Sequence, residues 1–267
     1  MQILIIGGGN MGLTYAQSFL RSHITRTEDL MILERSPELA ERLRTKGIGT
    51  VYADPQACMP RADLIIFAVK PQDAPALFAS LRPHIDPQQV FLSIMAGVTM
   101  EGMKTALGVE KVIRAMPNLP AQIGMGMTAF TSSDAVTRIE LVMVQNLLNT
   151  TGKTVYVEQE SAIDSATAIS GSGPAYVFYF MDAMMCAARE MGFSESEADL
   201  LVSQTFRGAV ELYNQTDRSC TDWIQRVASK GGTTEAALLS YGDARVSEQI
   251  QAGARAALDR AVELGKG

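Results

Sequence analysis

Short apolar runs alternate with amphipathic segments through the first part of the chain. The apolar runs are continuous, which is typical of strands that are buried on both faces of a parallel sheet. They predict seven strands, at residues 2–6, 30–33, 63–69, 90–94, 111–114, 127–131 and 153–157. Helical spacing of apolar residues lies between several of them, as at residues 11–22 and 38–46. This alternation predicts an α/β domain with a parallel sheet covered by helices on both faces.

The pattern changes after Gln159, where strand-like runs stop and helical spacing continues alone. Pro174 stands at a helix start and Gly192 at a helix end. Ser194 and Glu197 have the spacing of a capping box. Further helices are expected at residues 194–212, 222–227, 234–241 and 243–264. The second part of the chain is therefore predicted to be all-α.

We predict two domains, at residues 1–159 and 160–267, without a proline- or serine-rich linker between them. The apolar stripes of the helical domain are rich in alanine and methionine. Such helices could form a bundle alone or intertwine with those of a second copy. Small residues allow close helix approach, which favours the dimer.

Composition and charge exclude several classes of protein. The 267 residues are 47% hydrophobic and 19% charged, and the formal net charge is -6, which disfavours binding to nucleic acid. No apolar run reaches the about 20 residues that span a bilayer, and the first residues lack the features of a signal peptide. We therefore expect a cytoplasmic protein without membrane contact. Three widely spaced cysteines, Cys58, Cys186 and Cys220, predict reduced thiols and no metal site.

A glycine-rich turn follows the first predicted strand and opens a helix. It reads GGGNMG and satisfies the G-x-G-x-x-G pattern of dinucleotide-binding folds. Gly7 allows the tight turn, Gly9 lets a pyrophosphate approach the backbone, and Gly12 permits close contact between helix and strand. Asn10 and Met11 lie at the helix N-terminus, where free N–H groups face the phosphates. The alternative to a dinucleotide site is a structural glycine turn that binds no ligand.

The end of the second predicted strand bears on the choice of dinucleotide. Glu34 lies near the offset at which an acid binds the ribose 2′-hydroxyl of NAD. Arg35 and Ser36 instead suit the 2′-phosphate of NADP. Glu34 could also point outward as a solvated charge. We favour NADPH, with NADH as the alternative.

Three further segments follow predicted strands at the edge where open α/β sheets bind ligands: AVKPQ at residues 68–72, SIMAG at residues 93–97 and RAMPNLP at residues 114–120. Each could be an ordinary turn when taken alone. Their succession predicts contacts with the dinucleotide from Ala68, Val69, Lys70, Pro71, Met95, Ala96 and Asn118.

Two segments of the helical part carry unusual chemistry. The first, SGSGPAY at residues 170–176, should break a helix and expose backbone donors. The second, SKGGTTE at residues 229–235, places two glycines before a helix start with threonines at or beside the cap. Such a turn can bind a small carboxylate, or it can be only a capped helix behind a glycine hinge.

Five motifs together resemble the pyrroline-5-carboxylate reductase family, in order along the chain: GGGNMG, AVKPQ, RAMPN, SGSGPAY and SKGGTTEAAL. The resemblance implies a Rossmann domain followed by a helical dimerisation domain. It also implies an interlocked homodimer, with active sites between one subunit's Rossmann domain and its partner's helices, and in many members a ring of dimers. Its reaction reduces the cyclic imine Δ1-pyrroline-5-carboxylate to L-proline with NADPH or NADH. This chain has Gly12 where many members have alanine, and Lys230 where many have proline.

The resemblance also implies roles for the second glycine loop. Thr234 would hydrogen-bond the ring nitrogen of the imine carboxylate. Ser229 and the loop backbone at Gly231, Gly232 and Thr233 would hold its carboxylate. Alternative functions are the reduction of a related cyclic imine, another Rossmann reductase such as a β-hydroxy acid dehydrogenase, and a non-catalytic dinucleotide sensor.

Overall fold

The computed structural model describes residues 1–265, which form two compact units. The sheet unit comprises residues 1–172 together with the residues from Ala257 onward, and the helical unit comprises Gly173–Ala256. The last strand ends at Tyr156 and every later element is a helix, so the predicted change from α/β to all-α is confirmed. The predicted domain boundary at residues 159–160 stays a prediction.

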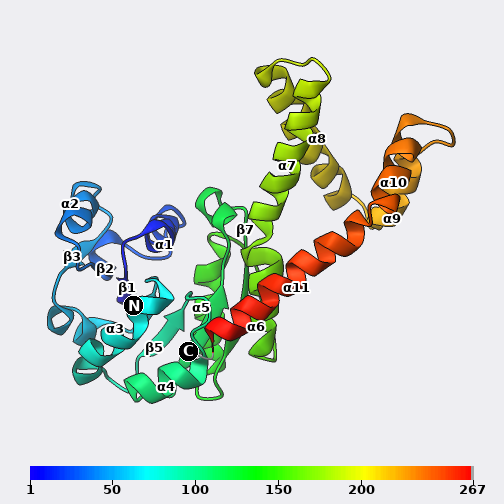
Figure 1. Ribbon diagram of the computed structural model, residues 1–267. Coiled ribbons are helices and arrows are strands. Elements are labelled where there is room, and N and C mark those ends of the chain that lie inside the picture. Colours follow the sequence, from blue (N-terminus) through cyan, green and yellow to red (C-terminus); the bar gives the residue numbers. More distant parts are fainter. Residues whose placement is uncertain (266–267) are drawn as a thin grey trace. The chain divides into compact units, whose positions relative to one another are not determined.

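The sheet unit is built on eight strands in the order β3-β2-β1-β4-β5-β6-β7-β8 (Figure 1). Seven of them correspond to the predicted strands, whereas the short edge strand β3 was not predicted because its residues form no apolar run. The bounds are β1 Ile3–Ile6, β2 Leu30–Leu33, β3 Thr50–Tyr52, β4 Leu64–Phe67, β5 Val90–Ser93, β6 Val112–Met116, β7 Gly126–Ser132 and β8 Gly152–Tyr156.

The expectation of a wholly parallel sheet is wrong at one step. Strands β1 to β6 pair in parallel, but β7 pairs antiparallel to β6, with Met116 opposite Ala129. The connection between them holds only a 3-10 helix, Leu119–Ile123. A connection of this length is too short for a helical crossover, so the chain turns back beside the strand it has left. Strand β8 then pairs in parallel with β7.

Helices cover both faces of the sheet, as predicted (Figure 1). Successive residues of the central strands enter opposite cores: Ile3 and Ile5 pack with Phe19 of α1, whereas Leu4 lies in the core that contains Phe78 of α3. Strands β1, β2, β4 and β5 are therefore buried on both sides, which explains their continuous apolar runs, whereas the edge strands β3 and β8 are half-buried or exposed. The helices of this unit are α1 Asn10–Arg21, α2 Pro37–Thr45, α3 Ala74–Leu81, α4 Met100–Leu107, α5 Arg138–Asn149 and α6 Ser161–Ala166.

The predicted helix break at SGSGPAY is a π-helical turn. Helix α6 continues directly into this turn, Thr167–Gly171, and α7 begins at Gly173. The Thr167 and Ser170 hydroxyls donate to the carbonyls of Ile163 and Ala166, one turn back. π turns of this kind are frequent at functional sites.

The helical unit follows the predicted pattern closely. Its helices are α7 Gly173–Glu190, α8 Glu195–Asn214, α9 Cys220–Val227, α10 Thr233–Asp243 and the first half of α11, Val246–Leu264. The predicted capping box is confirmed: the Ser194 hydroxyl accepts from the Glu197 N–H, and the Glu197 carboxylate accepts from the Ser194 N–H. Helix α11 begins three residues later than expected, because Arg245 turns the chain in the left-handed region, with φ 52°.

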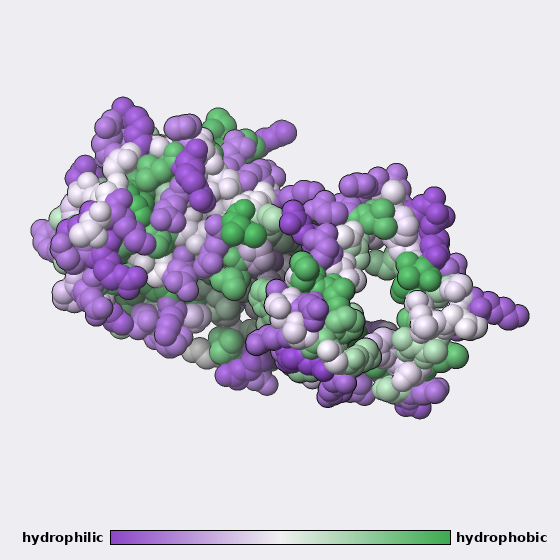
Figure 2. Space-filling model, turned by 90° about the horizontal axis from the view of Figure 1, so that it is seen from above, coloured by the Kyte–Doolittle hydropathy of each residue, from purple (hydrophilic) through white to green (hydrophobic). Residues whose placement is uncertain are grey.

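The helical unit buries little apolar surface by itself. Of its residues, all of which the structure describes, only Ala198 and Val202 are buried apolar side chains. Tyr179 is 73% exposed, and exposed apolar side chains are visible on the surface in Figure 2. Tyr176, Tyr179 and Phe180 of α7 line a cavity of about 360 Å³ with residues of α11. Exposed apolar side chains gathered on one unit in this way indicate a surface that associates with another protein chain.

Among the helices of residues 1–265, none has both the length and the apolar composition that a membrane span requires. Cys58, Cys186 and Cys220 are free thiols, as predicted. Cys58 is buried, and this burial raises the pKa of its thiol to about 11. The Cys58 thiol is therefore a packing group and not a nucleophile at neutral pH.

Candidate cofactor pocket and substrate loop

The glycine turn between β1 and α1 is closely packed on one side and open on the other. Gly7 has φ +99°, and a Cβ there would lie 2.8 Å from the Ala68 carbonyl oxygen. A Cβ at Gly12 would overlap the Gly7 carbonyl oxygen, whereas a Cβ at Gly9 would meet nothing within 4 Å. Only glycine permits the backbone to pass this closely at Gly7 and Gly12.

The open side of the turn has donors for an anion. Gly9 is the N-cap of α1 and gives the helix no side-chain cap. The N-terminal N–H groups and the positive end of the helix dipole therefore face the open space above Gly9. This geometry meets the requirements of a pyrophosphate, so the residues present fit a dinucleotide.

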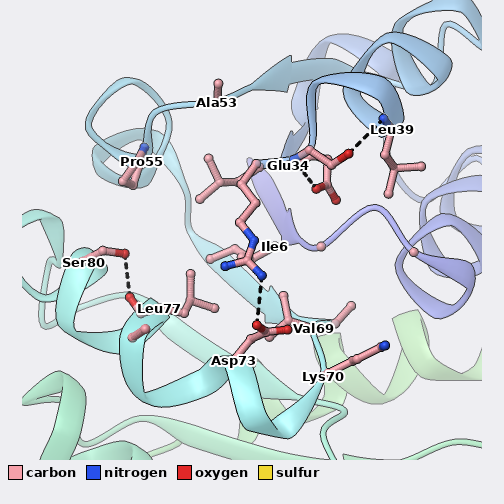
Figure 3. Close-up of a pocket in the computed structure, with 17 residues that line it drawn as sticks. Ile6, Glu34, Leu39, Ala53, Pro55, Val69, Lys70, Asp73, Leu77 and Ser80 are labelled. Atoms are coloured by element: carbon pink, nitrogen blue, oxygen red, sulfur yellow. Dashed lines mark hydrogen bonds and ion pairs between the residues drawn. The ribbon is translucent and has the colours of Figure 1, made fainter.

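A cavity of about 540 Å³ extends from the turn along the ends of β1, β2 and β4 (Figure 3). It brings together seven residues that the sequence predicted as cofactor contacts: Gly7, Gly9, Arg35, Ser36, Ala68, Val69 and Lys70. Hereafter it is called the cofactor pocket. Its position at the carboxyl ends of parallel strands is where open α/β sheets bind ligands.

Seven other predicted contacts lie outside the wall of the pocket. Asn10, Met11 and Gly12 form the first turn of α1, and Pro71 opens the 3-10 turn after Lys70. Met95 and Ala96 follow β5, where Met95 is buried. The roles of these residues toward a dinucleotide, and that of Asn118, stay predictions.

Asn118 holds three segments of the sheet unit together. Its amide donates to the Ser170 carbonyl over 3.0 Å, and its oxygen accepts from the Met127 N–H over 2.9 Å. The side chain thus joins the end of β6 to β7 and to the π-helical turn. This structural role was not predicted, because its partners lie 52 and 9 positions away in the chain.

Several walls of the pocket were not predicted from the sequence. Leu39 and Leu77 provide apolar surface, and Asp73 forms an ion pair with Arg35 over 2.9 Å. Ala53 and Pro55 follow β3. The one local signal was the charge of Asp73 just after the AVKPQ motif; the positions of the other residues depend on how α2, β3 and α3 pack.

The second glycine loop connects α9 to α10 in the helical unit. Gly231 has φ +73°, and its N–H donates to the Glu235 carboxylate over 2.6 Å. The Gly232 N–H donates to the Ser229 carbonyl over 3.0 Å. An added Cβ at Gly232 would lie 2.5 Å from Ser229 Oγ, so the Ser229 hydroxyl lies against Gly232. The loop therefore places Ser229 beside the start of α10.

Helix α10 begins at Thr233 without a side-chain cap at Gly232. Thr234 is the second residue of the helix and is half-buried. The uncapped start leaves the Thr233 N–H and the Thr234 hydroxyl at a helix N-terminus, which attracts anions. The Gly232 N–H, predicted as a donor to substrate, is engaged within the loop. Each predicted substrate contact stays a prediction.

The sheet order and the glycine pocket define a dinucleotide-binding protein of the Rossmann type. A family model described as "NADP oxidoreductase coenzyme F420-dependent" matches residues 2–97, which confirms an NAD(P)-binding domain. A second model, "Pyrroline-5-carboxylate reductase dimerisation", matches residues 160–264. Pyrroline-5-carboxylate reductase 2 of Bacillus subtilis (strain 168) is 35% identical over 252 residues, which cover 93% of this chain and 90% of that protein.

Solved structures agree over the whole chain. A pyrroline-5-carboxylate reductase from Coxiella burnetii is 29% identical, with a TM-score of 0.91 and coverage of 100% of this chain and 99% of that one. The pyrroline carboxylate reductase of Plasmodium falciparum, solved with NADP bound, is 25% identical, with a TM-score of 0.90 and coverage of 99% and 98%.

The chain belongs to the pyrroline-5-carboxylate reductase family, the NAD(P)H-dependent oxidoreductases of proline biosynthesis. The family, the fold class and the enzyme class predicted from the sequence are therefore confirmed. The helical unit lies within the family's dimerisation domain, which indicates a homodimer and accounts for its exposed apolar side chains.

Proposed function

We propose that this chain reduces Δ1-pyrroline-5-carboxylate to L-proline with NAD(P)H. The observation that carries the proposal is the full-length similarity to pyrroline-5-carboxylate reductases, in a chain whose glycine turn opens into the cofactor pocket. The reduction of a related six-membered imine is the alternative.

The chemistry requires positioning more than acid catalysis. The bound dinucleotide supplies the hydride that adds to the imine carbon. A substrate that arrives with its nitrogen protonated needs no strong general acid, in keeping with His23 and His84 as the only histidines. The Thr234 hydroxyl would orient the ring nitrogen by a hydrogen bond. Ser229 and the Thr233 N–H would hold the carboxylate at the uncapped start of α10, against the loop backbone at Gly231 and Gly232, whose N–H groups donate to the Glu235 carboxylate and the Ser229 carbonyl.

The preference for NADPH that Arg35 and Ser36 predict belongs to this proposal. Both residues line the cofactor pocket, and Lys70 adds a further cation. The relative from Plasmodium falciparum was solved with NADP bound, which supports NADPH as a cofactor. NADH stays the alternative, because Glu34 lines the same pocket.

The assembly and location are also part of the proposal. We infer an interlocked homodimer in which the cavity between α7 and α11 accepts apolar side chains of a second copy. A ring of dimers and active sites shared between subunits follow from the family resemblance alone. The predicted cytoplasmic location is likewise proposed.

The direct test is oxidation of NADPH by the purified protein in the presence of Δ1-pyrroline-5-carboxylate, repeated with NADH. We expect substrate-dependent oxidation of at least one dinucleotide, with proline as the product. If the protein reduced only a six-membered imine, that imine would replace Δ1-pyrroline-5-carboxylate as the proposed substrate. Dinucleotide binding without turnover of either imine would refute the proposed reaction.

Replacing Thr234 with alanine is expected to lower kcat/KM by about tenfold or more, because a hydrogen bond to the reacting nitrogen is lost. Thr234→Ser keeps the hydroxyl and should retain most of the activity. Steady-state kinetics at saturating dinucleotide would measure both variants.

The matched control is Thr221→Ala, which removes an exposed hydroxyl from α9 of the same unit. Its kcat/KM should stay within about twofold of the unmodified protein, as for surface substitutions away from a site. If Thr234→Ala behaved like this control, Thr234 would have no part in the mechanism.

A further inference from the structure

Glu34 lies directly after β2 and is held inside the cofactor pocket (Figure 3). Although glutamate is usually exposed, this residue is only 9% exposed. One carboxylate oxygen accepts from the Gly8 N–H over 2.9 Å, and the other accepts from the Ser36 N–H over 2.8 Å. Glu34 is therefore a fixed group of the pocket wall and not a solvated charge.

The bond to Gly8 places this carboxylate next to the glycine turn. A dinucleotide whose pyrophosphate lies on the turn directs its adenosine ribose toward the end of the second strand. An ionised carboxylate has about four acceptor sites, so two N–H bonds leave capacity for a ribose hydroxyl. The Glu34 carboxylate is thus oriented for a ligand with a free 2′-hydroxyl.

The groups that suit a 2′-phosphate have other partners. The Arg35 guanidinium forms an ion pair with Asp73 over 2.9 Å, and the Ser36 N–H donates to Glu34. The Ser36 hydroxyl accepts from the Leu39 N–H as the cap of α2, although its hydrogen can still donate. The charged residues of the pocket wall are two acids, Glu34 and Asp73, and two bases, Arg35 and Lys70. The wall therefore has no excess of positive charge for a phosphate dianion.

We propose that Glu34 is a specificity-determining residue, which binds the adenosine 2′-hydroxyl of NADH and opposes the 2′-phosphate of NADPH. This inference rests on the proposed function for the identity of the site and refines its choice of cofactor. Like charges at close range repel, and the two bases of the pocket wall, Arg35 and Lys70, are already balanced by Glu34 and Asp73. Glu34 thereby makes NADH a cofactor of this protein and weakens the advantage that Arg35 and Ser36 would give to NADPH.

The test is to measure the dissociation constants of NADH and NADPH by fluorescence titration, without imine substrate. The full-length protein is compared with Glu34→Gln, and with Glu34→Ser as a second variant. The ratio of the NADPH constant to the NADH constant is expected to fall by about tenfold or more in both, the scale of one charged hydrogen bond.

Glu38→Gln is the matched control, since it removes the same charge from an exposed position in the first turn of α2, outside the pocket. Its ratio should stay unchanged. The proposal would be overturned if the ratio of the two dissociation constants changed by less than about twofold in both Glu34 variants. It would also be overturned if NADH failed to bind the unmodified protein. Equal weakening of both dinucleotides would overturn it too, because it would show that Glu34 only supports the glycine turn.

Binding requires no turnover, so this result is separable from the proposed reaction. A protein that shows the expected ratios but reduces no imine would refute the reaction and retain the role of Glu34. Thermal unfolding of each variant shows whether a change in binding reflects a loss of folded protein.

Discussion

Replacing Gly9 with valine is expected to weaken dinucleotide binding about a hundredfold while leaving the protein folded, because a pyrophosphate could no longer reach the backbone. A Cβ at Gly9 meets no protein atom within 4 Å, and the residue has the extended conformation φ -69°, ψ -170° that valine also adopts. The cost to stability should be about 1 kcal/mol or less, the difference between glycine and valine at an N-cap. Fluorescence titration and urea denaturation would measure the two effects.

Gly12→Val is the contrasting variant. Its Cβ would overlap the Gly7 carbonyl oxygen, so the turn itself must move and both stability and binding should fall. If Gly9→Val bound NADH and NADPH with unchanged affinity, the pyrophosphate could not lie on this turn. A large loss of stability in Gly9→Val would show instead that the open space above Gly9 is needed by the protein.

Replacing Arg114 with alanine is expected to lower the free energy of unfolding by about 3 kcal/mol, because two carboxylates lose a buried partner. The Arg114 side chain is 1% exposed, and its guanidinium contacts Glu160 over 3.1 Å and Asp164 over 2.6 Å. Glu160 also accepts from the Met100 N–H over 2.8 Å. Arg114 therefore joins β6 to α6 and, through Glu160, to the start of α4. Urea denaturation would measure the loss.

Arg26→Ala is the matched control for Arg114→Ala. Arg26 also forms ion pairs with two acids, Glu28 over 2.6 Å and Asp29 over 2.8 Å, but its side chain is 72% exposed. Exposed pairs stabilise by about 1 kcal/mol or less, so this variant should unfold close to the unmodified protein. Equal losses in the two variants would show that burial does not determine the strength of the Arg114 cluster.

Much of the fold could be predicted because its signals are local. A strand buried on both faces needs a continuous apolar run, and such runs coincide with the fully buried strands β1, β2, β4 and β5. Ser194 and Glu197 lie within one helical turn, so their spacing alone located the start of α8. The glycine turn is equally local, since G-x-G-x-x-G describes the shape of one short segment of backbone.

The candidate site was predicted only in part, for the same reason. Seven of the predicted residues line the cofactor pocket, and these lie in or beside short motifs at strand ends. Asp73 and Leu77 were missed because their place in the wall depends on the packing of α3. The Gly232 N–H was expected to face substrate, but the backbone of the loop turns so that this N–H donates to the Ser229 carbonyl.

The sequence by itself determined the class of fold, the helical second half, the glycine turn and the family, because each is recorded in the order and spacing of neighbouring residues. Only the tertiary structure decided that β7 runs antiparallel to β6, that Arg114 pairs with acids 46 and 50 positions away, and that Glu34 is bound by Gly8 across 26 positions. These features join segments distant in the chain, and no local pattern specifies which distant polar groups meet when the elements pack.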